Sequence, residues 1–270
     1  MTRKAKKNST APPGGPDPER ISALGTEDPV AGIPGPGRWL VAEYQPTTLF
    51  SLKTSQATSS VGVSLVIPTP YAIKMAFVDA AFRAGLEVEQ DYDRFLRSLS
   101  KLDLRIAPAA AAVTTNTFLK VRQESRGKDP LHPYGSTIAY REMVYLYGSW
   151  LWAFDLACGD ILLAERLVRL APHVNYIGKR GSFIQYKGLH RHAVLGADFS
   201  QPLENGMSVA NLGRVHVRPL DDFGPEADLE TLSSFTVTKP KRDRHRKFVT
   251  TIIPVGIVNS GPGFSEYRKG

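Results

Sequence analysis

The sequence has little cysteine and no long apolar run, and both deficits narrow the classes of protein that it fits. A single cysteine, Cys158, excludes a disulfide within the chain and a zinc site built from cysteines. We predict that it is a small buried residue. No apolar stretch approaches the roughly 20 residues that cross a bilayer, and the basic N-terminus has no apolar signal-peptide core. We therefore expect a cytoplasmic protein without a membrane partner.

Motifs of catalysis and metal binding are scarce as well. The six histidines form no H-E-x-x-H motif, and His190 and His192, on an expected strand, lack a carboxylate at a recognised spacing. The chain contains neither a G-x-S-x-G elbow nor a P-loop. We predict no catalytic residue, no metal and no cofactor. An open alternative is a metal-independent ribonuclease with a histidine or tyrosine base near a lysine. Its candidate residues are His132, His173, Tyr176 and Lys179.

Positive charge, by contrast, is in excess. The 270 residues include 34 lysines and arginines against 26 acidic residues, which gives a net charge of +8, and 42% of the chain is hydrophobic. Such a chain can bury a sizeable core, and its basic excess favours an anionic partner such as nucleic acid. Residues 1–38 contain 13 prolines and glycines and few large apolar side chains. We predict that this segment is a disordered tail.

The folded part is organised around one expected helix. Thr69 and Pro70 form a hydroxyl N-cap followed by a proline at the first helical position, and Gly85 supplies the C-terminal stop. Apolar residues recur at helical spacing over residues 73–80, so the helix is expected to be buried on most sides. Lys74 is a charged residue within this mostly apolar helix, and its presence there requires an explanation. It either extends out to solvent or contacts a ligand.

Strands are expected on both sides of this helix. The pattern predicts strands at 39–44, 47–52, 63–67, 102–106, 113–122, 140–147 and 150–156, and helices at 91–100 and after Asp160. The last two strands are expected to pair across a tight turn at Gly148 and Ser149, at the centre of a sheet. The polar segment 123–134 is expected to project as a long hairpin. From His190 onward, strand and turn signals indicate a small β-rich appendage.

Three basic loops are candidates for phosphate contact. Lys53 opens a loop rich in hydroxyl groups, which equally suits any exposed loop. The turn Gly178-Lys-Arg-Gly-Ser182 combines two glycines, which let backbone N–H groups approach an oxyanion, with two cations. The run Lys239–Lys247 packs six lysines and arginines into nine residues. An acidic loop over Asp221–Glu230 precedes it. A basic run is often only a solvated turn, so its contact with RNA rests on the overall excess of charge.

Several of these segments together resemble one known family. The sequence S-L-V-I-P-T-P leads directly into the buried helix, and Y-R-E-M-V-Y-L-Y and N-Y-I-G-K-R-G-S-F follow later in the chain. Over Trp39–Gln185 the chain resembles the Cas five family, the RAMP-type subunits that hold the 5′ handle of the guide RNA in type I CRISPR effector complexes. Arg141 and Glu142 match the arginine and glutamate of the family's central strand. A G-x-G-x-x-G motif near the C-terminus, which other RAMP proteins carry, is missing.

The resemblance implies a fold, a function and partners. The expected fold class is α+β, with a ferredoxin-like (RRM/RAMP-type) β-α-β-β-α-β core at 39–188, an extended thumb hairpin and the β-rich appendage at 189–270. The implied function is that of a noncatalytic, guide-RNA-binding subunit of a Cascade-like antiviral defence complex, capping its backbone subunits. The implied alternative is a metal-independent endoribonuclease that processes CRISPR repeat RNA. Implied partners are guide CRISPR RNA, Cas seven-type backbone subunits, the large subunit and target DNA near the PAM. The residues predicted to contact RNA are Lys53, Lys74, Arg141, Gly178, Lys179, Arg180, Gly181, Ser182, Lys241, Arg242, Arg244 and Arg246.

Overall fold

The computed structural model describes most of the chain after residue 30. The described residues are 31–53, 63–85, 89–124, 134–157, 159–179, 181–208, 212–232 and 239–270. Cys158, Arg180 and His132 lie outside them, as do residues 1–30 of the predicted tail. The last residues of that predicted tail are packed on the fold. The N–H of Arg191 donates to the carbonyl of Pro34 at 2.7 Å, and Arg38 forms an ion pair with Asp155. The ordered chain therefore begins before Trp39, which corrects the predicted boundary.

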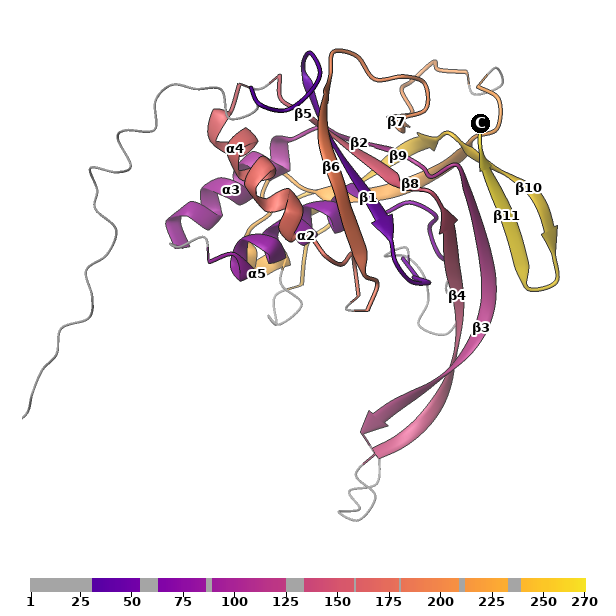
Figure 1. Ribbon diagram of the computed structural model, residues 1–270. Coiled ribbons are helices and arrows are strands. Elements are labelled where there is room, and N and C mark those ends of the chain that lie inside the picture. The colour runs from indigo at the N-terminus through magenta and orange to yellow at the C-terminus, as the bar shows by residue number, and fades with distance from the viewer. Residues whose placement is uncertain are drawn as a thin grey trace, which may run out of the picture.

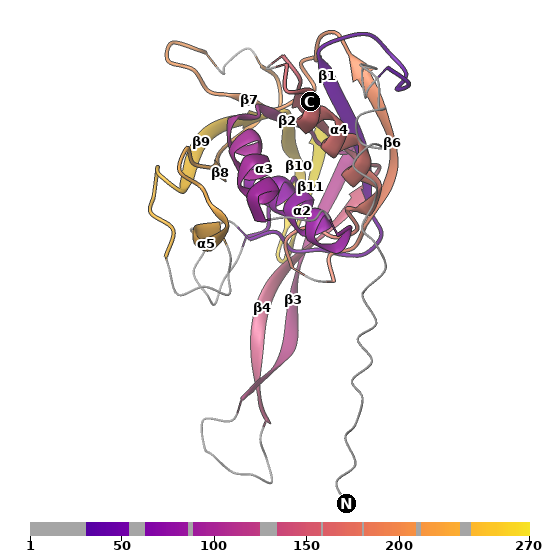
Figure 2. The same ribbon diagram turned by 90° about the vertical axis from the view of Figure 1, so that its left-hand side faces the viewer.

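Four strands form the first sheet, with antiparallel neighbours throughout. They are β1 (Trp39–Pro46), β2 (Leu104–Ala107), β5 (Trp150–Asp155) and β6 (Ile184–His192), in the order β2-β5-β1-β6. The pairs β1 with β5, β1 with β6 and β2 with β5 are all antiparallel. Three helices lie together on one side of this sheet (Figures 1 and 2). The mixture of helices and antiparallel sheets is compatible with the α+β class.

The helices begin where the sequence signals place them. The helix α2 (Pro70–Arg83) has Thr69 as its N-cap, whose Oγ1 accepts from the N–H of Ala72 at 3.2 Å. The helix α4 (Ile161–Leu170) is capped by Asp160, and α3 (Glu89–Lys101) covers the predicted second helix. Arg166 of α4 is buried although it is charged, with its guanidinium 5.7 Å from the ring centre of Phe95 in α3.

The second sheet contains the longest strands of the protein. Its order is β10 (Val255–Gly261), β11 (Phe264–Lys269), β3 (Ala111–Glu124) and β4 (Tyr134–Tyr147). The strands β3 and β4 pair over their whole length of 14 residues each, and their far half extends away from the body in Figure 1. The predicted projecting hairpin is thus confirmed, and it is longer than expected. We call its part beyond Thr117 and Arg141 the thumb.

Four of the predicted strands behave differently. The strands β4 and β5 do not pair with each other: β4 pairs with β3, whereas β5 pairs with β1 and β2. Gly148, at φ 102°, lets the chain turn from one sheet into the other. The segments 47–52 and 63–67 form only isolated bridges, Phe50 with Val144 and Lys53 with Ser64. Both segments cross between sheets, so they cannot continue a ladder.

The C-terminal strands are part of the same structure. A third sheet, in the order β7-β9-β8, consists of β7 (Gln201–Pro202), β8 (His216–Phe223) and β9 (Arg246–Ile253). Two short helical segments, η1 (Ala171–His173) and α5 (Leu229–Leu232), complete the elements. The predicted boundary after residue 188 falls inside β6, and β11 pairs with β3. Buried Leu220, Ile253 and Tyr267 join the main hydrophobic cluster, so the predicted appendage shares the core of the rest.

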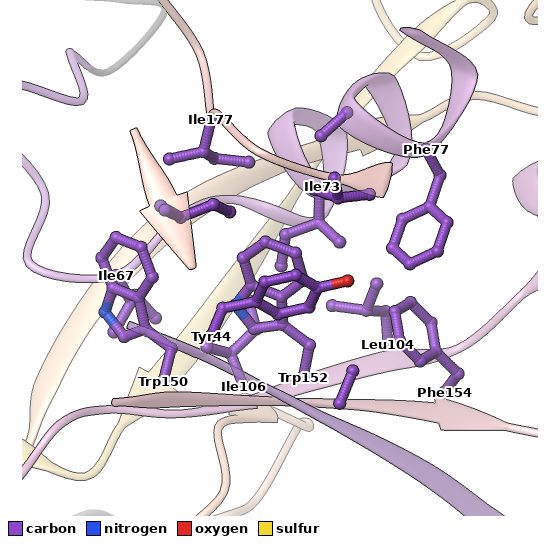
Figure 3. Packing of buried hydrophobic residues seen from close by; sticks show 14 of the residues in the cluster. Tyr44, Ile67, Ile73, Phe77, Leu104, Ile106, Trp150, Trp152, Phe154 and Ile177 are labelled. Carbon is purple, nitrogen blue, oxygen red and sulfur yellow. The ribbon is translucent and has the colours of Figure 1, made fainter. Parts of the chain in front are cut away.

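Aromatic residues of the first sheet fill the centre of that core (Figure 3). The Tyr44 ring stacks on Trp152 with their centres 4.1 Å apart, and its hydroxyl donates to the carbonyl of Ala171 at 2.8 Å. Phe77 of α2 meets Phe154 edge to face at 5.3 Å. Large buried aromatic rings contribute strongly to core stability. The aromatic density of residues 150–154 thus marks the middle of the first sheet, as predicted for β5.

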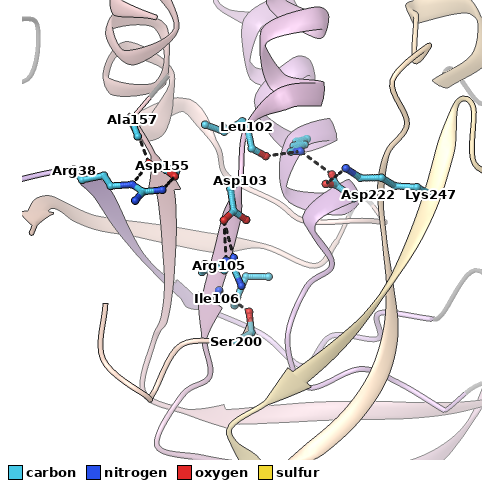
Figure 4. A network of polar contacts seen from close by, with 11 residues as sticks. Arg38, Leu102, Asp103, Arg105, Ile106, Asp155, Ala157, Ser200, Asp222 and Lys247 are labelled. Carbon is cyan, nitrogen blue, oxygen red and sulfur yellow. Dashed lines mark hydrogen bonds and ion pairs between the residues drawn. The ribbon is translucent and has the colours of Figure 1, made fainter. Parts of the chain in front are cut away.

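Lys74 is the one lysine with a side chain that is completely buried in the described part of the chain. Its ammonium lies 2.7 Å from a carboxylate oxygen of Asp222 in β8 and donates to the carbonyl of Leu102 at 3.0 Å, in the network of Figure 4. Burial lowers its pKa, and Asp222 partly offsets that effect. Lys74 therefore neither reaches solvent nor contacts RNA in this conformation, which corrects its predicted role.

We expect Lys74→Ala to lower the free energy of unfolding by about 3–5 kcal/mol, because it leaves the buried Asp222 carboxylate with only the more distant Lys247, at 3.7 Å, as a cationic partner. Urea denaturation measures this loss. The double variant Lys74→Met, Asp222→Leu should lose less than the single one, since it removes both charges and keeps apolar volume. Exposed Lys101→Ala serves as the control and should stay within about 0.5 kcal/mol of wild type. A loss for Lys74→Ala as small as that of the control would contradict the ion pair.

Candidate nucleic-acid interface

The predicted glycine turn is a tight connection between η1 and β6. Gly178 and Gly181 adopt φ of 69° and 103°, a region that glycine enters without strain. The N–H of Ser182 donates to the carbonyl of Lys179 at 3.1 Å, and Ile177 N–H donates to the Ser182 carbonyl at 3.1 Å. The Ser182 N–H is thus used inside the turn and its side chain is buried. Lys179 is exposed, as are Gly178 and Gly181.

Residues 47–52 hold this turn in place. The N–H of Thr47 donates to the Phe183 carbonyl at 3.0 Å, and the Thr48 hydroxyl donates to the Gly181 carbonyl at 3.3 Å. A Cβ on Gly178 would lie 3.0 Å from the Leu52 side chain, so glycine is needed there for packing as well as for its φ. The turn therefore rests directly on the segment that leads into Lys53.

The same segment is bonded to β4 on its other side. Phe50 and Val144 exchange two backbone hydrogen bonds of 3.1 and 2.7 Å. Further along the chain, the N–H of Ser64, whose residue forms the bridge with Lys53, donates to the carboxylate of Glu142. Glu142 directly follows Arg141 on β4. Lys53 and Arg141, from segments distant in sequence, are both close enough to Lys179 to act on its charge.

We call Lys53, Arg141 and Lys179 the basic cluster, and their mutual repulsion is evident at Lys179. Partial burial lowers the pKa of Lys179, and the positive charges of Arg141 and Lys53 lower it further. An anion near these cations would relieve the repulsion, and phosphate oxygens accept hydrogen bonds from lysine and arginine side chains. The local excess of positive charge makes the base of the thumb a candidate site for an anion. All three residues were predicted to contact RNA, whereas their proximity was not predicted.

The predicted basic run at 239–247 is largely neutralised within the protein. Arg244 pairs with Glu226 at 2.6 Å, and Arg246 pairs with Asp221 while its guanidinium lies 4.1 Å from the ring centre of Tyr71. Lys247 lies 3.7 Å from Asp222. The acidic loop and the basic run therefore bind each other, an outcome that spacing along the chain does not indicate. Arg246 is partly buried in its ion pair, whereas Arg244 and Glu226 form an exposed pair; the RNA contacts of both arginines stay predictions.

Two other members of that run face solvent. Lys241 and Arg242 are exposed, and Arg242 lies over the ring of Phe248 at 5.5 Å from its centre. The Arg242 guanidinium is also 3.9 Å from the Asp243 carboxylate. Surface pairs at this distance contribute little energy, so Lys241 and Arg242 remain accessible cations.

A pocket that no sequence motif indicates opens close to the basic cluster. It has a volume of about 260 Å³ and is lined by Ser64 and by His216, Arg218 and Tyr267 from β8 and β11. The His216 ring meets Tyr267 edge to face, with centres 5.5 Å apart. Residues 216 and 267 come from opposite ends of the C-terminal half, so only the folded topology brings them together. The alternating pattern at 214–218 was the one available sign that His216 and Arg218 share a face.

Neither a metal site nor a membrane span is found within the described ranges. No group of three or more histidine, cysteine, aspartate or glutamate residues there is placed to hold a metal ion. His190 and His192 are exposed on β6. No helix in that part of the chain is both long and apolar enough to cross a membrane.

Comparison with known proteins gives one curated relative. No family model matches the chain. The CRISPR-associated protein Cas5 of Archaeoglobus fulgidus is 20% identical to it over 220 residues, which cover 78% of this chain and 91% of the relative. This match confirms the resemblance to the Cas5 family. A crystal structure of a CRISPR protein from Archaeoglobus fulgidus covers 86% of this chain and 92% of its own, at a TM-score of 0.44 and 12% identity. The sequence match to the Cas5 protein alone covers most of the chain.

We expect Arg141→Ala to raise the pKa of Lys179, because it removes one of the two cations that disfavour the charged amine. NMR titration of the protein with ¹³C-methylated lysines measures this directly. Arg169→Ala, on the outer face of α4 and paired with Glu165, serves as the control and should leave the Lys179 titration unchanged. An unchanged titration in Arg141→Ala would show that the two residues are not neighbours in solution.

Proposed function

We propose that this protein is a noncatalytic RNA-binding subunit that holds the 5′ handle of the guide CRISPR RNA in a type I effector complex. The observation that carries the proposal is the basic cluster at the base of the thumb. Lys53 and Arg141, from separate segments, both act on the charge of Lys179, and an anion such as the phosphate backbone would relieve this repulsion. The name of the curated relative supports the CRISPR context. A cytoplasmic location follows from that context.

The order of the first sheet supports a RAMP-type assignment. In chain order its strands and helices run β1, α2 with α3, β2, β5, α4 and β6. This is a β-α-β-β-α-β series, and the sheet order β2-β5-β1-β6 places the first and third of its strands in the middle. We assign it as a ferredoxin-like core. The hairpin of β3 and β4 is inserted between the two middle elements of that series, where a thumb is expected.

Recognition of the RNA would combine charge with position. Lys179 projects from a turn fixed by hydrogen bonds on both sides, and Arg141 projects from a paired strand. Rigid placement reduces the entropy lost when these side chains bind a phosphate. Single-stranded RNA fits such a site because its backbone can bend to follow the cations and its bases can turn away from one another. Among the candidate residues of the alternative ribonuclease, His173 is exposed on η1.

We expect Lys179→Ala and Arg141→Ala each to weaken binding of guide RNA. Each variant should also reduce the slope of log affinity against log salt concentration by about 0.7 for every phosphate that its side chain no longer neutralises. Fluorescence anisotropy at several salt concentrations, in EDTA, measures both quantities. Arg169→Ala is the matched control, because its guanidinium lies on the outer face of α4, paired with Glu165. It should leave the slope unchanged.

Three outcomes would contradict the proposal. Equal slopes for wild type and both cluster variants would show that the basic cluster does not contact phosphates. Binding that does not depend on salt would exclude RNA as the ligand of this surface. Specific cleavage of the repeat RNA in EDTA would replace the noncatalytic function with that of the metal-independent endoribonuclease.

The thumb carries exposed apolar side chains that suit a protein partner. Phe118 and Ile138 are 71% and 73% exposed, and Tyr140 lies between them on the same face, with its ring centre 5.0 Å from that of Phe118. Contiguous exposed apolar residues commonly mark interaction surfaces. We propose that this face contacts the backbone subunits of the complex. The large subunit and target DNA near the PAM are further proposed partners of the assembled protein.

We expect the double variant Phe118→Ser, Ile138→Ser to lose most of its association with a co-expressed Cas seven-type subunit, while its melting temperature stays close to wild type. The reason is that these side chains contribute apolar contact area to a partner and almost none to the core. Size-exclusion chromatography and thermal denaturation measure the two effects. Val194→Ser, which changes another exposed apolar residue at 79% exposure, is the control. Unchanged association of the double variant would contradict the assignment of the thumb.

A further inference from the structure

The pocket beside the basic cluster has a deeply buried apolar floor. It lies between residues 64–67, the start of β8, the junction of β9 with β10, and β11. The floor consists of Leu65, Val66, Ile67, Ile253 and Val255, each at most 7% exposed. Its volume of about 260 Å³ is somewhat below the roughly 300–1,000 Å³ of sites for larger ligands. The pocket therefore fits a small, flat, largely apolar group.

Polar groups at the rim offer hydrogen bonds without a buried charge. Burial lowers the pKa of His216 and neighbouring Arg218 lowers it further, so the imidazole is neutral at neutral pH. A neutral imidazole has one donor and one acceptor nitrogen. Burial raises the pKa of Tyr267 and the nearby Glu142 charge raises it further, against smaller opposite effects of Arg218 and a hydrogen bond with Ser265, so the hydroxyl stays protonated. Exposed Arg218 adds donors at the mouth. This combination matches the edge of a heteroaromatic ring, which presents both donors and acceptors.

Backbone contacts connect the pocket to the basic cluster. Ser64 lines the pocket and also forms the bridge with Lys53. The N–H of Ser64 donates to Glu142, the neighbour of Arg141 on β4, and the Glu142 charge acts on Tyr267 inside the pocket. The cationic surface and the pocket are thus two sides of one short stretch of structure. Ser64 is therefore common to the wall of the pocket and to the bridge that positions Lys53.

We propose that this pocket receives one unstacked nucleobase of the RNA whose phosphates bind the basic cluster. The inference rests on the proposed function and assigns it a base-binding residue set, His216, Arg218 and Tyr267. Stacking against an aromatic side chain and hydrogen bonding to a base edge are how proteins bind single-stranded RNA. A free phosphate is a poorer occupant, because the floor is apolar and the Glu142 carboxylate lies nearby.

The test removes bases one at a time. A guide RNA handle with a single abasic nucleotide at each position in turn is bound to wild-type protein and to His216→Ala. At one position we expect wild type to lose about tenfold or more in affinity, the usual effect of one stacked base. His216→Ala should lose a similar factor on intact RNA and nothing further on RNA that is abasic at that position. His192→Ala, an exposed histidine of β6, is the matched control and should keep the full abasic penalty.

The possible results separate a failure of the base pocket from a failure of the proposed RNA-binding function. If RNA binds with a salt slope that the cluster variants reduce, but no abasic position couples to His216, the base pocket is wrong and the proposed function stands. If wild type shows no salt-dependent RNA binding, both are wrong. If His216→Ala has a lower melting temperature than wild type, the abasic series is repeated with Arg218→Ala, because the Arg218 side chain is exposed and lies outside the core. Absence of coupling in a folded Arg218→Ala would then overturn the pocket.

Discussion

The ion pair of Lys74 with Asp222 joins the two halves of the chain. Lys74 comes from the most buried helix, and Asp222 comes from a strand about 150 positions later, on the third sheet. Two charges removed from water are stable there only because they neutralise each other and because the Leu102 carbonyl accepts a further hydrogen bond. The pair therefore fixes the position of β8 against α2. Buried Leu220 and Phe223 of β8 and Ile253 of β9 belong to the main hydrophobic cluster, so apolar contacts join the C-terminal strands to the core together with this pair.

The candidate site depends on a second constraint, the position of residues 47–53. This segment contacts the glycine turn through Thr47 and Thr48 and contacts β4 through Phe50. Its irregular path, which is neither helix nor strand, allows it to touch both neighbours. The cations of the basic cluster are therefore held at fixed places on three supports, which is the arrangement expected where binding needs rigid geometry.

Local signals in the sequence were sufficient for the helices and for the thumb. Thr69 and Asp160 are N-caps because their side-chain oxygens bond backbone N–H groups a few residues away, so a short window contains the whole interaction. The pairing of strands is different, since Gly148 serves as well for a hairpin turn as for a passage between sheets. The contacts of Arg244 and Arg246 with Glu226 and Asp221 are likewise long-range, so no local signal in the sequence indicates them. The residues of the basic cluster could be recognised from local sequence signals. The place where they come together depends on long-range contacts set by the topology.

The direct passage from β4 into β5 has a mechanical consequence. Two residues, Gly148 and Ser149, separate the last residue of the thumb hairpin from Trp150, which is buried at the centre of the first sheet and donates from its indole to the Val66 carbonyl at 2.9 Å. The base of the hairpin is therefore anchored in the hydrophobic core, through a strand whose Trp150 indole also bonds to residues 64–67 in the wall of the pocket.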